Sequence, residues 1–267
     1  MLRIFLLFTA VIPLTANTPI PFASDPTSIR GCVRIGQHIS MHATEVTVAE
    51  YCEFLRANGY DRSLYPDYNA LGDSTYQWIF DGISGTKGWN ALARKIIQTH
   101  PGPWKKPRIG IPLNYPIVGI TYEQALQYCA WKEADINKDR TDDKKIKVGL
   151  PSIGWYQSLI PAIDSITHSH KFYPCLVPTF NYKYSFCVRE GMDPMASGHS
   201  LVRADAYWPT PEGLYDLKGN AAEMTSTKGI AMGGSFRQYA ADCTGDHQQS
   251  YIDPQDWLSF RYIVTLR

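Results

Sequence analysis

The run "GLYDLKGNAAEMT", residues 213–225, differs from the rest of the chain, most of which shows ordinary globular patterning. It contains two glycines, two acidic residues and an Asn, but no clear helical or strand period. One explanation is a tight turn in which the Asp216 side chain caps nearby backbone N–H groups and Asn220 braces the turn. The surrounding sequence must explain why Glu223 lies in the same run.

The bulk composition is that of a folded protein. The chain has 267 residues, of which 44% are hydrophobic and 19% are charged. Its formal net charge of +1 gives no electrostatic reason to expect a nucleic-acid partner or an anionic membrane surface. No internal repeat or low-complexity linker divides it, so we expect one domain over 25–267, with a long loop insertion at about 60–114.

The N-terminus resembles an export signal. A short positive region ends at Arg3, and an apolar run follows over residues 4–16, with small residues at Thr15 and Ala16. We therefore expect a signal peptide over 1–16, the alternative being a buried N-terminal strand. The run is too short to span a bilayer, no later segment is long enough, and no Cys follows to carry a lipid anchor.

Cysteine usage leaves two possibilities open. The chain has six cysteines, and an even number in an exported protein permits up to three disulfides. The alternative is buried free thiols, which is a serious possibility for Cys52 and Cys129 because both lie on helical patterns. No C-x-x-C motif occurs, which argues against a zinc knuckle or a thioredoxin-like site. The six positions are Cys32, Cys52, Cys129, Cys175, Cys187 and Cys243.

Two segments carry helix-start signals. Thr47 predicts a helix over about 48–57, with Gly59 as its stop. Thr121 predicts a second helix, preceded by a short strand over 117–120. The apolar stripe expected on the second helix is Tyr122, Ala125, Leu126, Cys129 and Ala130. Short strands are expected within 230–236 and 260–266.

Six blocks occur in the order seen in one known family. They are "EVTVAEYCEFL", "PIVGITYEQALQYCAW", "GLPSIGWYQSL", "GLYDLKGNAAEMT", "MGGSF" followed by Cys243, and "SFRYIVTL". In this order the chain resembles the formylglycine-generating enzyme family, also called the sulfatase-modifying factor domain, over roughly residues 40–265. The resemblance implies an α+β fold related to C-type lectins, with few helices, short twisted strands and extensive ordered loops.

The resemblance also implies a structural calcium ion at the first run. By position, Asp216 and Glu223 would supply side-chain oxygens, while Gly219 and Ala221 would supply backbone carbonyls. A hard cation binds several oxygens, and a glycine-containing turn lets carbonyls converge on it. The family's other calcium site would fall between about 180 and 207, where only the surroundings of Asp205 are recognisable.

The oxidase chemistry of the family is not matched. Those enzymes bind Cu(I) through two cysteines, five positions apart, just after the G-G-S turn. Here the second position is Cys243 but the first is Gln238, and an amide cannot replace a copper-binding thiolate. The usual Arg before G-G-S is missing, and Tyr262 stands where the disulfide partner of Cys129 would be. Cys243 is the catalytic candidate only if the oxidase is active.

A second, weaker calcium candidate is the segment "DINKDRTDDKKI". Asp135, Asn137 and Asp139 alternate as in the first half of an EF-hand loop. Arg140 occupies the glycine position, however, and Ile146 the position of the bidentate Glu. A solvated acidic loop is the alternative.

Together these features predict an exported, non-catalytic domain that serves as a structural or protein-binding part of a bacterial envelope or surface assembly. It resembles the gliding-motility and type IX secretion proteins that use this domain without the copper cysteines. It would be periplasmic, outer-membrane-associated or secreted. Aromatic side chains of the insertion are the expected partner contacts or, alternatively, its core: Tyr76, Trp78, Trp89 and Trp104. The alternative functions are a copper-dependent formylglycine-generating oxidase and a calcium-dependent lectin-like binder.

Overall fold

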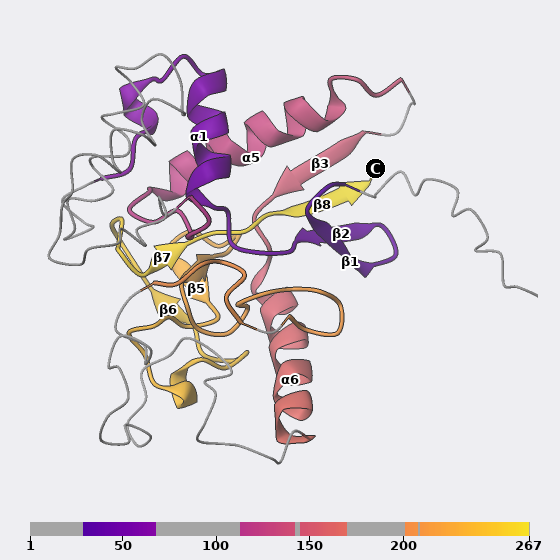
Figure 1. Ribbon diagram of the computed structural model, residues 1–267, viewed down its shortest axis with the longest axis vertical. Coiled ribbons are helices and arrows are strands. Elements are labelled where there is room, and N and C mark those ends of the chain that lie inside the picture. Colours follow the sequence, from indigo (N-terminus) through magenta and orange to yellow (C-terminus); the bar gives the residue numbers. More distant parts are fainter. Residues whose placement is uncertain (1–28, 68–112, 142–144, 170–200, 208, 267) are drawn as a thin grey trace, which may run out of the picture.

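A computed structural model describes residues 29–67, 113–141, 145–169, 201–207 and 209–266. The predicted signal peptide and the four aromatic side chains proposed as partner contacts lie outside these residues, as do Cys175 and Cys187. Within the described residues the chain forms an α+β fold with few helices and two small sheets, as predicted (Figure 1).

The first sheet joins the two ends of the described chain. Its order is β1 (Cys32–Gly36), β2 (Ile39–His42), β8 (Ile263–Leu266) and β3 (Ile146–Gly149), and every neighbouring pair is antiparallel. The C-terminal strand thus lies between β2 and β3 and ties the N-terminal hairpin to the middle of the sequence.

The second sheet is built from very short strands. Its order is β6 (Gln249–Ser250), β5 (Ile230–Met232), β4 (Ala222–Met224) and β7 (Leu258–Ser259). Strands β4 and β7 pair in parallel, whereas the other pairs are antiparallel. The expected strands within 230–236 and 260–266 are confirmed as β5 and β8.

Helix α1 (Val48–Ala57) begins and ends as the sequence predicts. Thr47 accepts a hydrogen bond from the backbone N–H of Glu50, and the Glu50 side chain accepts one from the backbone of Thr47, which completes a capping box. The chain then leaves the helix through Gly59 at φ 66°, a conformation that glycine adopts without strain.

Helix α5 (Tyr122–Asn137) has the predicted N-cap at Thr121, closed by the side chain of Gln124. The predicted stripe is partly wrong, because Leu126 is 42% exposed and Ala130 is also exposed. The buried face instead runs through Gln124, Ala125, Tyr128 and Cys129. The Tyr128 ring packs against the rings of Tyr51 and Phe260, so the face of the helix that carries Tyr128 is the one that faces the core.

The strand predicted over 117–120 does not form. Ile117 donates its N–H to the carbonyl of Val46, and Gly119, at φ 72°, donates to the carbonyl of Gln255. The backbone hydrogen bonds of this segment therefore go to two different parts of the chain, and no continuous ladder is possible.

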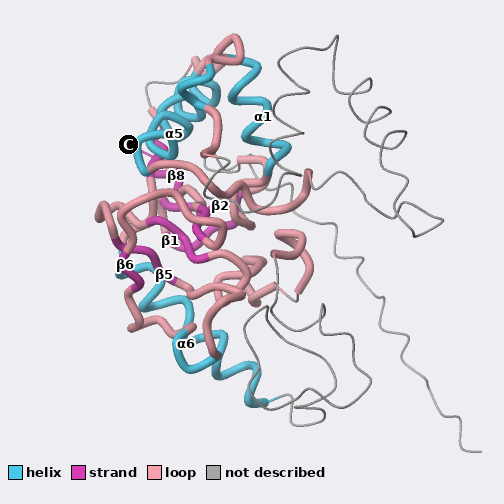
Figure 2. Tube along the Cα trace, turned by 90° about the vertical axis from the view of Figure 1, so that its left-hand side faces the viewer, coloured by secondary structure: helices cyan, strands magenta, loops and turns pink. Residues whose placement is uncertain are grey.

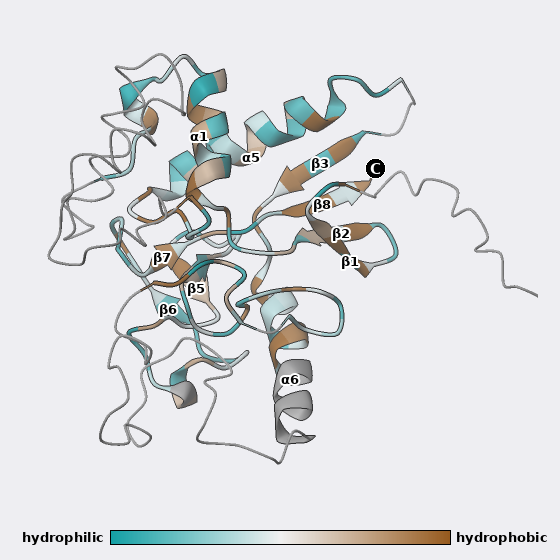
Figure 3. Cartoon of the chain, in the orientation of Figure 1, coloured by the Kyte–Doolittle hydropathy of each residue, from teal (hydrophilic) through white to brown (hydrophobic). Residues whose placement is uncertain are grey.

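The remaining helical elements are α6 (Ile153–Ser169), which contains Pro161, and the short η1 (Arg62–Leu64) and η3 (Ala240–Asp242). Helices α1 and α5 lie at one end of the molecule and α6 at the other, with the strands between them (Figures 1 and 2). Hydrophobic residues colour much of β1, β2 and β3, while hydrophilic residues line parts of α5 (Figure 3).

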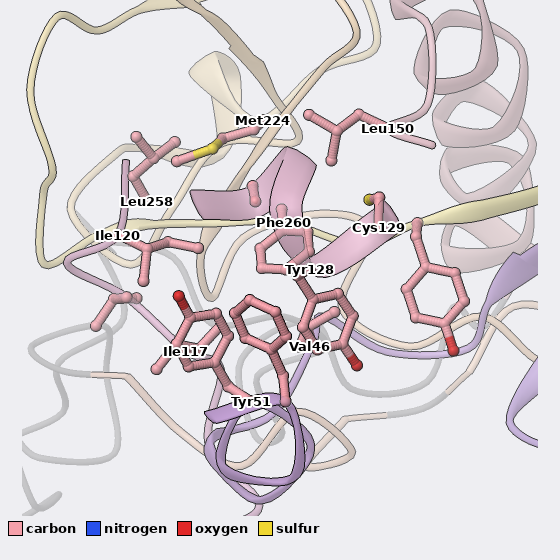
Figure 4. Close-up of a cluster of buried hydrophobic side chains, with 14 of the residues drawn as sticks. Val46, Tyr51, Ile117, Ile120, Tyr128, Cys129, Leu150, Met224, Leu258 and Phe260 are labelled. Carbon is pink, nitrogen blue, oxygen red and sulfur yellow. The ribbon is translucent and has the colours of Figure 1, made fainter. Parts of the chain in front are cut away.

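Two buried hydrophobic clusters fill the interior. The larger packs α1 and α5 against the second sheet, and Figure 4 shows Tyr51, Tyr128 and Phe260 at its centre. The smaller cluster contains Met41, Tyr156, Ile160, Leu214, Leu217 and Met232. The run 213–225 therefore starts in the smaller cluster and ends on β4, next to the larger one.

Candidate functional site

A buried charge cluster lies where the run 213–225 meets the end of β2 and the segment before β8. It consists of Glu45, Asp216, Glu223 and Arg261. Glu45, Glu223 and Arg261 are 0% exposed, and Asp216 is 3% exposed. Charged side chains are almost never fully buried unless they are paired, so the contacts of each side chain in this cluster decide whether its burial is favourable.

Glu223 and Arg261 form a two-pronged ion pair. Arg261 Nε donates to Glu223 Oε2 at 2.5 Å, and Nη2 donates to Oε1 at 2.5 Å. The Tyr156 hydroxyl also donates to Glu223 Oε2, at 2.7 Å. Such parallel, charge-assisted hydrogen bonds are among the strongest that a carboxylate makes.

Arg261 also binds three backbone carbonyls. Its Nη1 donates to the carbonyls of His42 and Ala43, each at 3.3 Å, and its Nη2 donates to that of Tyr215 at 2.8 Å. One guanidinium therefore holds together β4, the end of β2 and the start of the turn in 213–225.

Asp216 has no comparable partners. Its backbone is left-handed, at φ 48°, and neither Oδ1 nor Oδ2 has a hydrogen-bond partner among the described residues, although both are buried. Burial raises the pKa of Asp216 to about 8; Arg261 opposes this rise, and the negative charge of Glu223 adds to it.

Glu45, like Arg261, is a member of this cluster that sequence reasoning missed. Its Oε1 accepts a hydrogen bond from Asn220 Nδ2 at 3.0 Å, but its Oε2 is buried and has no hydrogen-bond partner in the described part of the chain. Burial and the neighbouring Asp216 raise the pKa of Glu45 well above its usual range. One sequence feature could have pointed to Glu45: it is an acidic residue directly before the buried Val46, in the first of the six blocks.

Asn220 braces the turn, as the sequence predicts. Besides its bond to Glu45, its Oδ1 accepts a hydrogen bond from the backbone N–H of Val202 at 3.0 Å. Its φ of 57° is left-handed, which Asn tolerates better than most residues.

The predicted calcium ligands lie close together in sequence, from the turn at Asp216 to Glu223 on β4, but the oxygens of their side chains differ in availability. The described residues give the oxygens of Asp216 no hydrogen-bond partner, which fits a hard cation, whereas both Glu223 oxygens contact Arg261. Among the described residues, no group of three or more His, Cys, Asp or Glu side chains is placed to hold a metal ion. Gly219 and Ala221 would contribute backbone carbonyls only. The calcium site with Glu223 as a ligand stays a prediction.

In the EF-hand-like segment, the Asn137 side chain forms hydrogen bonds to the backbone of Ile146. Asn137 Nδ2 donates to the carbonyl of Ile146, and Asn137 Oδ1 accepts from the N–H of Ile146, so this side chain ties the end of α5 to β3. Asp135 lies 3.8 Å from Lys132, and Asp139 is exposed. Weak calcium binding at Asp135, Asn137 and Asp139 also stays a prediction.

The segment after the G-G-S turn is tightly packed. A Cβ on Gly234 would lie 2.4 Å from Cys243 Sγ, and Cys243 itself is 0% exposed. Gln238 Oε1 accepts hydrogen bonds from Ser235 N at 2.7 Å and from Ser235 Oγ at 3.0 Å. The amide at the first copper position therefore closes the turn.

The described cysteines are free thiols: Cys32, Cys52, Cys129 and Cys243. No disulfide therefore involves these four, and the arrangement with three disulfides that an even count permits does not form. Burial raises the pKa of the Cys243 thiol to about 12, so this thiol is protonated at neutral pH.

Tyr262, at the position of the expected disulfide partner of Cys129, stacks on His42, with ring centroids 4.6 Å apart.

Over the described residues, no helix combines the length and the apolar character needed to cross a membrane.

Three solved structures share similarity with the chain. PvdO from Pseudomonas aeruginosa is 14% identical, with a TM-score of 0.49, over 85% of this chain and 80% of that one. CarF is 14% identical, with a TM-score of 0.49, over 89% of this chain and 96% of that one. Treponema denticola variable protein 1 is 12% identical, with a TM-score of 0.44, over 87% of this chain and 90% of that one. No curated protein matches the sequence.

The family comparison matches a little under half of the chain. The description "Sulfatase-modifying factor enzyme 1-like domain" matches residues 29–157, which contain β1, β2, α1, α5 and β3. The blocks from residue 213 onward lie beyond the matched residues. Residues 29–157 are thus similar to the sulfatase-modifying factor enzyme 1-like domain, and the chain has a formylglycine-generating-enzyme-like α+β fold.

Proposed function

We propose that this protein is an exported, non-catalytic formylglycine-enzyme-like domain that serves as a structural or protein-binding component of a bacterial envelope or surface assembly. The observation that carries the proposal is the role of Gln238. In the oxidases that the chain resembles, copper is bound by one thiolate at the position of Gln238 and a second thiolate at the position of Cys243.

Gln238 is integrated into the local structure. Its side-chain oxygen accepts two hydrogen bonds from Ser235 and thereby completes the turn after β5. A side chain that satisfies backbone donors has a structural role, and an amide oxygen is a poor ligand for the soft Cu(I) ion. This contact supports a domain that keeps the turn and has exchanged the copper ligand.

The surroundings of Cys243 support the same proposal. Its sulfur is buried against Gly234 and lies 4.0 Å from the Ser235 carbonyl. A copper ligand must lose its proton, and burial acts against that by raising the pKa of this thiol. Cys52 and Cys129, in contrast, belong to the larger hydrophobic cluster around α1 and α5.

A lectin-like function is less well supported. A sugar-binding calcium ion needs open coordination positions at the surface. The carboxylates of the buried charge cluster are 0 to 3% exposed, so an ion held there would be out of reach of a carbohydrate.

A Cu(I) titration tests the non-catalytic assignment. The reduced full-length protein and the Cys243→Ser variant would be titrated against a competing Cu(I) chelator. We expect the same weak binding for both proteins. Tight one-to-one binding that is lost in Cys243→Ser would reject the proposal in favour of the oxidase, and oxidation of a sulfatase-derived peptide would then be the next assay.

The partner contacts are proposed from sequence alone. A variant with Trp78, Trp89 and Trp104 changed to Ala would be compared with the wild type by crosslinking in envelope extracts. If the aromatic side chains bind a partner, the variant keeps its melting temperature and loses specific crosslinks. If they form the core of the insertion, the variant loses stability instead.

A further inference from the structure

His42, at the end of β2, is a buried side chain whose two ring nitrogens both face oxygen atoms. The side chain is 6% exposed. Its Nδ1 lies 3.0 Å from the carbonyl oxygen of Thr44, and its Nε2 lies 2.9 Å from Glu50 Oε1. Both are hydrogen-bond distances, so each nitrogen of the ring has an oxygen partner.

These two contacts define the protonation of the ring. A carbonyl oxygen can only accept a hydrogen bond, so His42 Nδ1 donates to Thr44. Glu50 Oε2 accepts two hydrogen bonds from Thr47, which favours the ionised carboxylate, and Glu50 Oε1 is then an acceptor as well. A neutral imidazole has one N–H and could serve only one of these oxygens. The geometry therefore requires an imidazolium ring with a proton on each nitrogen.

Glu50 supplies the counter-charge of this ring. Tyr262 stacks on the ring, and Cys32 of β1 lies directly opposite His42 in the sheet. Burial raises the pKa of Cys32 to about 11 and the pKa of Tyr262 well above its usual range, so both groups keep their protons and are neutral. Neither neighbour can therefore replace the carboxylate of Glu50.

The other groups around the ring are cationic or neutral. Lys132 of α5 acts on the Cys32 thiol, and Arg261 Nη1 donates to the backbone carbonyl of His42 at 3.3 Å. Burial also raises the pKa of Tyr128 on α5 well above its usual range. Among the described residues that surround the ring, Glu50 is thus the anion.

The contact joins β2 to the first turn of α1. Glu50 also closes the capping box of α1, through the hydrogen bonds that it accepts from Thr47. Gly31 lies against the ring at φ 81°, and an added Cβ there would be 3.2 Å from His42 Nε2. The ring is therefore closely enclosed, and a nitrogen that lost its proton would still face an oxygen that cannot donate.

We propose that His42, Thr44 and Glu50 form a pH-sensitive clamp, which holds the start of α1 against β2 while the His42 ring carries both protons. Loss of one proton breaks the contact to Glu50 or to Thr44, and the first turn of α1 loosens. Because the closed clamp retains the proton, its stabilisation is present at low pH and is lost as the pH rises. The clamp does not depend on the proposed function of the domain.

NMR spectroscopy of the imidazole nitrogens in the isotope-labelled full-length protein tests the protonation. His42 would be assigned from the signals that are missing in His42→Gln. At about pH 5 both nitrogens of His42 should carry a proton, and toward about pH 8 one of them should lose it. Glu50→Gln should show a neutral ring at a pH at which the wild-type ring still carries both protons. A neutral His42 ring in the folded wild type at about pH 5 would overturn the proposal.

Amide hydrogen exchange tests whether this proton controls α1. The amides of Glu50 and Tyr51 donate to Thr47 and report on the first turn. Their protection, referred to an unstructured peptide at the same pH, should fall at least about tenfold between about pH 5 and about pH 8, because a hydrogen bond to a charged group contributes that much.

The first turn of α5 is the internal control. The amides of Gln124 and Ala125 donate to Thr121 in the same arrangement, but the side chain of Gln124 donates to backbone carbonyls and not to a titrating group. Protection of these two amides should not change over this pH range. A constant ratio of α1 to α5 protection, while His42 loses its proton, would overturn the proposal even if no variant folds.

Two variants assign the effect to His42. His42→Gln is neutral at every pH, so the pH dependence of α1 protection should disappear. His38→Gln, in the exposed turn between β1 and β2, should keep the wild-type behaviour. Burial raises the pKa of Asp216 to about 8, so a pH dependence that persists in His42→Gln would assign it to another group and reject the clamp. None of these outcomes bears on the copper titration, so the two proposals fail independently.

Discussion

Arg261 and Glu223 form a fully buried ion pair, joined by two hydrogen bonds of 2.5 Å across 38 residues of sequence. Arg261 also binds the carbonyl of Tyr215, so this pair connects the run 213–225 to the C-terminal strand. Its position explains why Glu223 is part of that run: the carboxylate anchors Arg261 at the junction of the two sheets.

Breaking this pair should destabilise the fold strongly. Glu223→Gln removes the carboxylate that accepts hydrogen bonds from Arg261 Nε and Nη2, and we expect a loss of about 3–5 kcal/mol in the free energy of unfolding. Urea denaturation followed by circular dichroism would measure it. Arg237→Ala is the control, since Arg237 pairs with Asp256 at the surface and should contribute less than about 1 kcal/mol. Similar losses for the two variants would contradict this role of Glu223.

The His42–Glu50 pair predicts acid sensitivity. His42 Nε2 lies 2.9 Å from Glu50 Oε1, while His42 Nδ1 lies 3.0 Å from the Thr44 carbonyl. Burial raises the pKa of Glu50, but the His42 charge and hydrogen bonds from His42 and Thr47 outweigh it and hold the pKa at about 2, against 4.5 for a free Glu. The folded state therefore binds the proton more weakly than the unfolded state.

Because the folded pKa is the lower one, this contribution is fully present above pH 4.5 and is lost as the pH falls toward 2. The Glu50 side chain is 31% exposed, so we expect a contribution of about 1–2 kcal/mol. Urea unfolding between pH 2 and 6 would measure it, with Glu50→Gln as the comparison. The difference between the two proteins should shrink as the pH falls, and a constant difference would exclude this linkage.

Tyr128 offers a stabilising substitution. Its ring contacts the rings of Tyr51, Phe54 and Phe260, but its hydroxyl is buried and none of the described residues hydrogen-bonds to it. Tyr128→Phe keeps the packing and removes the unsatisfied hydroxyl, so the free energy of unfolding should rise by about 1 kcal/mol. Tyr128→Ala should instead lower it by about 3–5 kcal/mol through the cavity it leaves. Chemical denaturation would compare the two, and a destabilised Tyr128→Phe would indicate that the hydroxyl has a partner.

The turn after β5 should not tolerate a side chain. Gly234→Ala places a Cβ 2.4 Å from Cys243 Sγ at a φ of 73°, so we expect a loss of more than about 2 kcal/mol. Gly59→Ala is the matched control: its φ of 66° is similar, but apart from its neighbours in the chain no described residue has an atom within 4 Å of the added Cβ. The control should therefore lose only about 1 kcal/mol. Equal losses in thermal melts would mean that backbone strain alone explains the effect, without the contact to Cys243.

Local sequence predicted the starts of helices α1 and α5. The side chains of Thr47 and Thr121 bond to residues three positions ahead, and such contacts depend on little outside the segment. The bracing role of Asn220 was also predicted, although its partners lie elsewhere in the chain.

Other features could not be predicted, because they depend on neighbours that are distant in sequence. The segment 117–120 has strand-like residues, but its hydrogen bonds go to Val46 and Gln255. The predicted stripe of α5 failed at Leu126 because the core lies on the side of Tyr128.

By itself, the sequence determined the starts of two helices and the glycine-rich turns, since these follow from hydrogen bonds and backbone preferences within a few residues. The α+β class was predicted through the order of the six blocks that the chain shares with a known family. Only the tertiary structure decided how the charges pair. Asn220 meets Glu45 across 175 residues, and Glu223 meets Arg261 across 38. A buried charge takes its partner from whatever the fold brings within hydrogen-bond distance, and spacing along the chain does not specify that choice.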